Sequence, residues 1–205
     1  MCKIVITGGL GYIGTELCKL YSGESRFKDI TVIDNRFVSK RVKQLRDWGI
    51  NFKQGHILDK EFIKEALDGA DVVYHLAGIT DVAYTKTESN ENQDNEIREV
   101  GIDGSKNIIE LSPKDCKIIF PSTHVVYEGF KETKFDITED VKTTPVLTYS
   151  IGKVKTEEDL CSSDKNYVIL RLASVYGYSL DTMRINIMPN LFSKIASQNG
   201  TIKMF

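Results

Sequence analysis

The sequence predicts an α/β fold built on a doubly wound parallel sheet. Short apolar, β-branched runs alternate with helix-length stretches along the whole chain. The runs are apolar throughout, which is typical of strands buried on both faces, and the strand-helix alternation implies parallel strands joined by right-handed crossovers. In such a sheet ligands collect beyond the carboxyl ends of the strands, so the residues that follow each run are the first candidates for function.

The predicted elements follow one another without an internal repeat. Five runs predict strands, and a sixth, INFKQ, predicts a weaker one: Lys3–Thr7, Ile30–Asp34, Asp71–Ala77, Lys117–Ser122, Asn166–Leu172 and Ile50–Gln54. The stretches between them predict helices at Gly11–Tyr21, Ser39–Trp48, Lys60–Leu67, Asn92–Glu110 and Tyr149–Leu160. A polar, aperiodic segment, Lys131–Pro145, predicts a surface loop.

Composition bounds the class of protein. With 205 residues, 41% hydrophobic and 27% charged, the chain can build one solid core. The net charge is −2 and no basic run is present, so we expect no nucleic-acid partner. No apolar stretch reaches membrane-spanning length and the first strand starts at once, so we expect a cytoplasmic protein. The four cysteines lie far apart, which predicts reduced core thiols and no metal site.

The first predicted turn holds a dinucleotide loop. Gly8, Gly11 and Gly14 take its three spaced positions in TGGLGYIG, where they allow a tight turn, approach of a pyrophosphate and close helix packing. Asp34 ends the second strand about 20 residues later, where a carboxylate can accept both ribose hydroxyls. The pattern predicts a Rossmann-type fold with NAD as cofactor. Asp34 would repel the 2′-phosphate of NADP, although Arg36 can in principle offset that repulsion.

Two tyrosines have a lysine four residues later, a spacing that places both side chains on one face of a helix and lets the ammonium lower the pKa of the phenol. Tyr127 and Lys131 enclose Gly129, which predicts a strand running into a loop. Tyr149 and Lys153 open a helix-length segment instead. We therefore predict Tyr149 as the general base and Lys153 as its partner, because a free tyrosine, with a pKa of about 10, ionises poorly near neutral pH.

The ordered motifs resemble the extended short-chain dehydrogenase/reductases, and among them the NAD-dependent epimerase/dehydratase family typified by UDP-glucose 4-epimerase. They are TGGLGYIG, the strand-terminal Asp34, HLAG at 75–78, PSTHVVYEG at 121–129, YSIGK at 149–153 and LRLASVYG at 170–177. The resemblance runs from the first strand to Phe205. It implies an NAD-binding domain over residues 1–177 and, at 178–205, the start of a substrate-binding region that is truncated and incomplete.

The resemblance also implies site residues. The cofactor would be contacted by Gly8, Gly11, Tyr12, Ile13, Gly14, Asp34, Asn35, Ile57, Leu76, Ala77, Gly78, Tyr149 and Lys153. Thr123 would bind the reacting sugar hydroxyl and complete a Thr-Tyr-Lys set, with its neighbour Ser122 as the alternative. Asn186 would bind the diphosphate of a nucleotide sugar. Gly101 stands where relatives often have an Asn, and His124 and Val125 replace the Asp-Glu pair that follows this Thr in 4,6-dehydratases.

The expected activity is that of an NAD-dependent nucleotide-sugar epimerase, with C4 as the leading position and a keto-sugar intermediate formed by transient hydride transfer. A nucleotide-sugar reductase or dehydrogenase of the same family and a non-catalytic NAD-binding module are the alternatives. By family analogy we expect a homodimer. His75 is interpreted as a structural histidine, His124 as a residue that alternation points away from the site, and Arg184 as either a diphosphate clamp or a packing residue.

Overall fold

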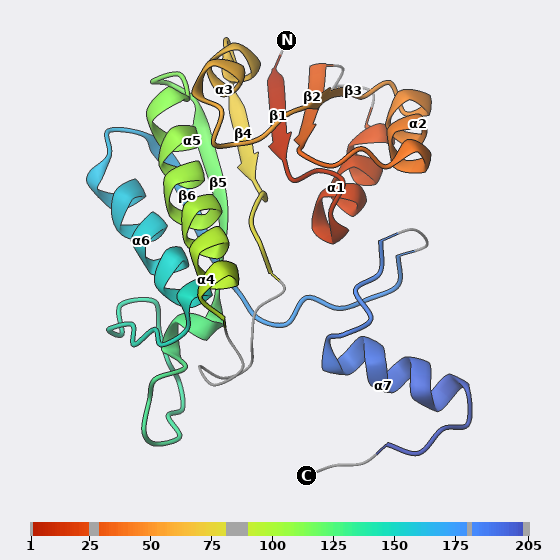
Figure 1. The fold of residues 1–205 in the computed structure, drawn as a ribbon, viewed down its shortest axis with the longest axis vertical. Coiled ribbons are helices and arrows are strands. Elements are labelled where there is room, and N and C mark those ends of the chain that lie inside the picture. Colours follow the sequence, from red (N-terminus) through yellow and green to blue (C-terminus); the bar gives the residue numbers. More distant parts are fainter. Residues whose placement is uncertain (1, 25–28, 81–89, 180–181, 203–205) are drawn as a thin grey trace.

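A computed structural model describes residues 2–24, 29–80, 90–179 and 182–202, and in them six parallel strands form one sheet in the order β3-β2-β1-β4-β5-β6 (Figure 1). The strands are β1 (Lys3–Thr7), β2 (Asp29–Asp34), β3 (Asn51–Gln54), β4 (Val72–His75), β5 (Lys117–Thr123) and β6 (Asn166–Leu172). The order reverses between β1 and β4, and ligands bind beyond the carboxyl ends of the strands at such a switch point. The predicted doubly wound parallel sheet is confirmed.

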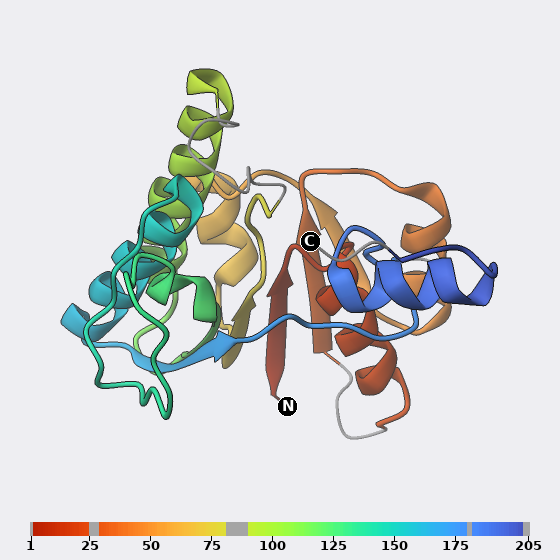
Figure 2. The ribbon, with the colours of Figure 1, turned by 90° about the horizontal axis from the view of Figure 1, so that it is seen from below.

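Helices cover both faces of this sheet (Figure 2). One face carries α1 (Tyr12–Ser22) and α2 (Ser39–Asp47), and the other carries α3 (Lys60–Leu67), α4 (Glu91–Arg98), α5 (Ser105–Leu111) and α6 (Thr148–Ser162). After β6 the chain crosses toward α1, where the Tyr12 phenol donates to the Gly177 carbonyl. It then forms α7 (Met188–Ser197), a helix that was not among the predicted elements.

Two apolar layers fix the sheet between these helices. Ile4 and Ile6 of β1 pack with the α1 and α2 side, whereas Val5 points into the layer under α3 and α5. This alternation buries the strand on both faces, as its uniformly apolar sequence predicts. All four cysteines are free thiols. Cys18 and Cys116 are buried, but Cys2 and Cys161 are exposed, so the expectation of core thiols is wrong for the latter pair. Cys2 precedes β1 and Cys161 lies on α6, so neither belongs to the apolar strands that are buried on both faces.

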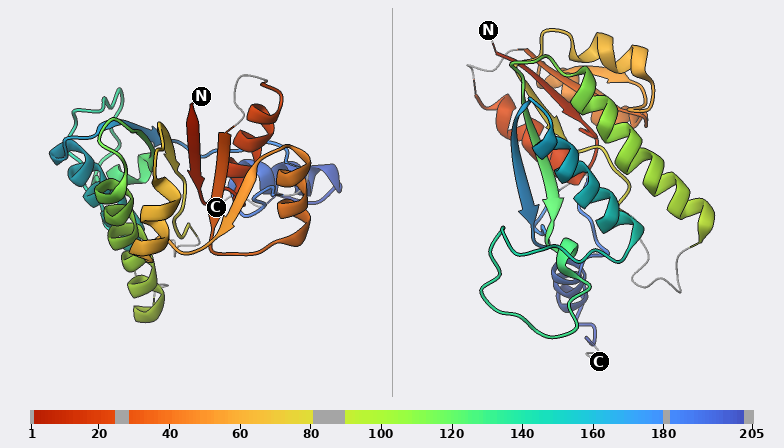
Figure 3. Two further views of the ribbon diagram at one scale, coloured as in Figure 1. Left: turned by 90° about the horizontal axis from the view of Figure 1, so that it is seen from above. Right: turned by 90° about the vertical axis from the view of Figure 1, so that its left-hand side faces the viewer.

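The helix predicted at Asn92–Glu110 is interrupted. A π-helical turn, Glu99–Gly104, joins α4 to α5, and the three segments run as one rod beside α6 (Figure 3). Within this turn the Gly101 carbonyl accepts the Ser105 hydroxyl at 2.6 Å and the Thr156 hydroxyl of α6 at 3.1 Å. A π turn leaves a carbonyl outside the regular α-helical ladder, and here side chains from two helices bind it.

A short turn and a closed loop connect β5 to the start of α6. A 3₁₀ turn, His124–Tyr127, follows the strand, and the Gly129 N–H donates to the Thr144 carbonyl at 2.9 Å, which closes the base of the predicted loop.

None of the described helices combines the length and apolarity needed to cross a bilayer. Across the described ranges, no group of three or more His, Cys, Asp or Glu side chains could hold a metal ion.

Candidate cofactor and active site

The glycine loop leaves no room for side chains at Gly8 and Gly14, so its backbone can approach a dinucleotide closely. Gly8 has a φ of +68°, and a Cβ there would lie 2.7 Å from the Ala77 nitrogen. A Cβ on Gly14 would lie 2.6 Å from the Cα of Gly9. Helix α1 begins directly after Gly11 with no side chain capping it, so the N–H groups of its first turn are available to an anion. The loop is therefore a cradle that fits the pyrophosphate of NAD.

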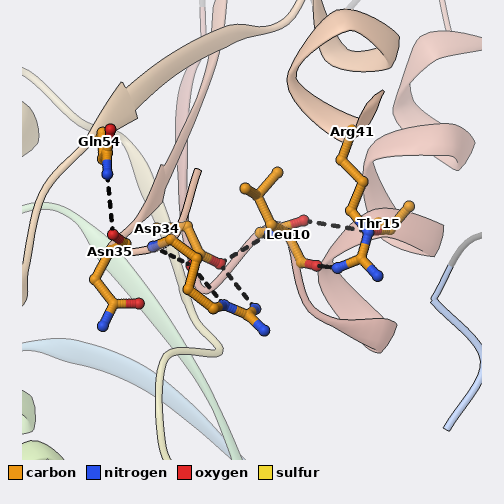
Figure 4. A network of polar contacts seen from close by, with 8 residues as sticks. Leu10, Thr15, Asp34, Asn35, Arg41 and Gln54 are labelled. Atoms are coloured by element: carbon orange, nitrogen blue, oxygen red, sulfur yellow. Dashed lines mark hydrogen bonds and ion pairs between the residues drawn. The ribbon is translucent and has the colours of Figure 1, made fainter. Parts of the chain in front are cut away.

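Asp34 lies beside this loop at the end of β2 (Figure 4). Its carboxylate is 3% exposed and accepts the Leu10 N–H at 3.1 Å, which ties the second strand to the loop. Arg36 donates to the same carboxylate through its backbone N–H and its Nε, both at 3.1 Å. The next residue, Asn35, accepts the Gln54 side chain through its carbonyl at 3.2 Å. The predicted ribose carboxylate is in place, but it already has a cationic partner.

The end of β4 is held by a relay of hydrogen bonds. The Ala77 N–H donates to the Thr7 hydroxyl at 3.2 Å, which bonds His75 Nδ1 at 2.9 Å. His75 Nε2 in turn bonds the Ser105 hydroxyl at 2.9 Å, and that hydroxyl donates to Gly101. Burial, and secondarily the charge of Lys153, lowers the pKa of His75 to about 3, so the ring is neutral. This geometry agrees with a structural histidine that fixes the segment 76–78, which follows β4, beside the loop.

Tyr149, Lys153 and Thr123 come together at the start of α6. Lys153 Nζ donates to the Pro121 carbonyl at 2.8 Å and lies 5.7 Å from the centre of the Tyr149 ring. The Thr123 hydroxyl lies close enough to the Tyr149 phenol to lower its pKa, and it accepts the Val125 N–H at 3.2 Å. Its neighbour Ser122 is buried and donates to Glu157, further along α6. The two hydroxyls therefore meet different residues of the same helix, Thr123 meeting Tyr149 and Ser122 meeting Glu157.

The second Tyr-Lys pair is not on a helix. Tyr127 lies in the 3₁₀ turn, donates to the Thr138 carbonyl at 3.2 Å and accepts Arg171. Lys131 follows in the irregular segment, where four-residue spacing does not align two side chains. The preference for Tyr149 and Lys153 over this pair is thus supported by their placement on α6.

The electrostatics of the pair differ from the expectation. Burial raises the pKa of the Tyr149 phenol, and the charge of Arg184 and the Thr123 hydroxyl oppose this rise only in part. Burial lowers the pKa of Lys153 to about 8, opposed by Glu157. The predicted lowering of the phenol pKa by Lys153 is therefore wrong for the chain by itself. Desolvation of the phenolate outweighs the nearby positive charge.

A small pocket borders both the Tyr149–Lys153 pair and the segment that follows β4. Its lining consists of Ala77, Gly78, Ile79, Ile97, Gly101, Ser105, Tyr149, Gly152 and Lys153. His124 is absent from this lining: its Nδ1 bonds the Leu172 carbonyl at 3.1 Å, and it borders a different cavity with Arg171 and Glu139. His124 therefore borders a different cavity from the one that Tyr149 lines.

Other predicted site residues have mixed surroundings. Ile13 is partly exposed at the start of α1, while Ile57 is 5% exposed, packs in the core and accepts the Asn107 amide through its carbonyl at 3.0 Å. Asn186 is exposed and accepts Arg184 Nε at 2.9 Å. A nearby Asn190 is buried instead, accepting the Gly177 N–H at 3.0 Å and donating to the Arg184 carbonyl at 2.9 Å.

Sequence reasoning missed the residues that position α6. The carboxylate of Glu128 accepts the backbone N–H groups of Val146 and Leu147 at 2.8 and 2.7 Å and also the Ser150 hydroxyl. It therefore caps a helix whose own N-cap residue, Leu147, offers no side-chain acceptor. Local sequence gives no signal for this cap, because the acceptor precedes the helix by a whole loop.

A mostly buried ion pair, Glu157–Arg171, connects the same helix to β6. Glu157 accepts Arg171 Nη2 at 2.6 Å, and their side chains are 7% and 19% exposed. Glu157 also accepts Ser122 and lies one turn after Lys153, whose charge it supports. In the sequence, the four-residue spacing from Lys153 is the pattern that indicates Glu157 as a partner of this lysine.

Fold and site together define an NAD-dependent Rossmann enzyme class with a Tyr-Lys pair beside the cofactor pocket. The model of the NAD dependent epimerase/dehydratase family matches residues 4–205, and the chain belongs to that family. NAD is the cofactor of this family.

Relatives and solved structures agree with this assignment. The chain is 31% identical over 183 residues to UDP-N-acetyl-alpha-D-glucosaminuronate decarboxylase of Bacillus cytotoxicus, covering 85% of this chain and 55% of that protein. It is 28% identical over 216 residues to UDP-glucose 4-epimerase of Mycoplasma genitalium, covering 96% and 61%. The crystal structure of UDP-glucuronic acid 4-epimerase from Bacillus cereus with NAD superimposes with a TM-score of 0.77 at 25% identity, covering 97% of this chain and 63% of that one. The chain thus spans less than two thirds of the length of these proteins.

Proposed function

We propose that the chain carries the catalytic half of a nucleotide-sugar epimerase that inverts a hexose at C4. The observation that carries the proposal is the convergence of Thr123, Tyr149 and Lys153 beside the pocket that Ala77 and Gly78 line. Relatives described as a UDP-glucose 4-epimerase and a UDP-glucuronic acid 4-epimerase support the same substrate class and reaction.

In this mechanism Thr123 accepts and orients the C4 hydroxyl, and ionised Tyr149 takes its proton. NAD held by the loop 8–14 and by Asp34 would supply the hydride acceptor and donor that epimerisation at C4 needs. Tyr149 gives the proton back in the second half, so protons and electrons balance over the cycle. Lys153 holds its ammonium under the phenol and beside Pro121, where it stabilises the phenolate as charge develops.

The surroundings of Thr123 favour epimerisation over elimination of water. Elimination from a keto-sugar needs an acid and a base next to the reacting carbons. Here the next two positions carry His124, whose ring bonds the Leu172 carbonyl, and apolar Val125. The two residues therefore offer no carboxyl pair at the place where the dehydratase pattern has one.

The test is product analysis with UDP-glucose and UDP-glucuronic acid, comparing wild type with Tyr149→Phe. We expect wild type to form the C4 epimer without net change of NAD, and Tyr149→Phe to lose at least about a hundredfold in turnover. Tyr127→Phe is the matched control, because it removes the phenol hydroxyl of the other Tyr-Lys pair outside the pocket. An unchanged rate in Tyr149→Phe would remove the mechanism, and stoichiometric NADH would replace the epimerase by a dehydrogenase.

A further inference from the structure

The carboxylate of Glu157 on α6 is held by side chains from two strands. Arg171 of β6 donates to it from Nη2 at 2.6 Å and from Nε at 3.1 and 3.2 Å. Ser122 of β5 donates its hydroxyl to the same carboxylate. The Glu157 side chain is only 7% exposed. Its negative charge therefore has one position, fixed by a guanidinium and a hydroxyl together.

Lys153 lies one helical turn before Glu157 and meets the same strand. Its Nζ donates to the Pro121 carbonyl at 2.8 Å, and Pro121 directly precedes Ser122 in β5. Residues four apart on a helix share a face, with Cβ atoms about 5–6 Å apart. The ammonium and the carboxylate are therefore neighbours on the side of α6 that faces β5.

The Lys153 ammonium needs a negative charge nearby because it is buried. Burial lowers the pKa of Lys153 to about 8, and the charge of Glu157 opposes this fall. An opposite charge within a few ångströms favours the ionised form of a buried group, and its removal leaves the desolvation cost unopposed. Without Glu157, the lysine would lose its proton at a lower pH.

The other described groups around Lys153 do not take the place of this carboxylate. On β4, burial and the charge of Lys153 keep the pKa of His75 at about 3, so that ring is neutral. On β5, the centre of the Phe120 ring lies 4.4 Å from Nζ, and the ring attracts a cation without carrying a net charge. Arg184, whose charge acts on the Tyr149 phenol, is positive. The pocket lining adds uncharged residues of the rod beside α6, namely Ile97, Gly101 and Ser105.

We propose that Glu157 is a positioning residue of the Tyr149–Lys153 pair, which keeps the Lys153 ammonium charged and beside the phenol up to alkaline pH. Its carboxylate acts through Lys153, and Arg171 and Ser122 hold it in place. Loss of the proton from Lys153 would remove a positive charge that stabilises the phenolate, so Glu157 would set the alkaline limit of the site. The inference rests on the proposed roles of Tyr149 and Lys153, whichever sugar is turned over.

The experiment is an NMR titration of Lys153 in the chain without NAD or substrate. The chain carries carbon-isotope-labelled lysine, and the Cε signal that Lys153→Arg removes is followed against pH. Glu157→Gln keeps the size of the side chain and an acceptor for Arg171 but removes the charge. We expect the Lys153 midpoint to fall by about one pH unit or more. Glu158→Gln is the matched control, since it removes an exposed carboxylate from the next position, and its midpoint should equal that of wild type.

Arg171→Gln separates the charge of Glu157 from damage to the structure. It breaks the same ion pair but leaves the carboxylate, so the Lys153 midpoint should stay in place or rise. Structural damage would instead move the midpoints of Glu157→Gln and Arg171→Gln in the same direction.

The double variant of Glu157→Gln and Arg171→Gln covers the case in which Glu157→Gln alone does not fold, because replacing both partners leaves no charge unpaired. Its midpoint should lie about one pH unit or more below that of Arg171→Gln. A fall of less than about half a pH unit in either comparison, or a fall in Arg171→Gln itself, overturns the proposal.

The rate profile gives a second measurement. In an active chain, the alkaline limb of the kcat/KM profile should move to lower pH in Glu157→Gln. The NMR titration uses no substrate, so a chain without epimerase activity overturns the proposed function and leaves the titration to decide on Glu157. An active chain whose alkaline limb stays in place in Glu157→Gln overturns this inference alone.

Discussion

In the β1–β3 half of the sheet, close backbone packing and the Asp34–Arg36 pair shape the ligand-binding edge, whereas in the β4–β6 half Glu128 and Glu157 hold the helix that carries Tyr149. Gly8 donates its N–H to the Ile33 carbonyl at 2.7 Å, and the loop has no room for a Cβ at Gly8 or Gly14. The other half relies on Glu128 and Glu157, which link residues that are 14 to 35 positions apart in the sequence. The cofactor edge is therefore sensitive to added bulk, and the catalytic edge to single polar substitutions.

Strand β2 in the first half and strand β6 in the second also differ in cover, because β2 lies inside the sheet and β6 at its edge. Ile30, Val32 and Ile33 of β2 are at most 2% exposed, whereas Val168 and Leu170 of β6 are 38% and 42% exposed. Strand β2 gains its stability from apolar burial on both faces. The half with the barer strand depends more on the ion pair between Glu157 and Arg171, and this difference sets the order of the effects expected below.

The largest effect is expected from Glu157→Ala. Removing this carboxylate leaves the mostly buried guanidinium of Arg171 with only the Tyr127 hydroxyl and the Glu139 carbonyl among its described partners, so we expect the free energy of unfolding to fall by about 2–4 kcal/mol. Urea denaturation measures the change. Glu158→Ala is the control, since its exposed carboxylate pairs only with Lys155 at 3.8 Å, and we expect a loss within about 0.5 kcal/mol. A loss below about 1 kcal/mol in Glu157→Ala would remove the contrast between the halves.

Gly8→Ala should be the next largest, and it tests the other half. The left-handed backbone costs an alanine about 1–2 kcal/mol, and the contact with the Ala77 nitrogen adds to that cost. Gly49→Ala is the control: its φ is +71°, and no atom lies within 4 Å of the added Cβ. We expect thermal unfolding to show a greater loss in Gly8→Ala, with NAD binding lost in that variant alone. Equal losses and retained binding would contradict the tight fit of the loop.

The smallest effect is expected on the pH dependence of kcat/KM. Arg184 lowers the pKa of Tyr149, so Arg184→Gln should raise that pKa. A general base works in its ionised form, and the acid limb of the kcat/KM profile should therefore move to higher pH. Arg184→Lys should keep the wild-type limb. A limb that stays in place in Arg184→Gln would show that the guanidinium does not act on the phenol during turnover.

Local patterns predicted the cofactor half well. The spacing of Gly8, Gly11 and Gly14 after a strand, and Asp34 at the end of the next, are features of neighbouring residues, so the sequence displays them directly. The arrangement of Tyr149 and Lys153 was predicted because helical spacing is local too. The functional roles given to all these residues remain predictions.

Long-range contacts were not predictable in the same way. The cap that Glu128 gives to α6 and the approach of Arg184 to the Thr80 carbonyl join residues far apart in sequence. The interrupted helix at Glu99–Gly104 has a tertiary cause, since Thr156 of α6 binds its open carbonyl. The exposed Asn186 and the buried Asn190 illustrate the same limit, because only the folded chain decides which amide meets Gly177.

The π turn at Glu99–Gly104 makes one wall of the pocket depend on a residue count. Ile97, Gly101 and Ser105 all border the pocket, although they belong to α4, the π turn and α5 in succession. Deleting one residue there would remove the extra residue that a π turn accommodates and would let the rod close into a regular α-helix with its two flanks in register. The Gly101 carbonyl would then enter the helical ladder, and Ser105 and Thr156 would lose the acceptor that they share.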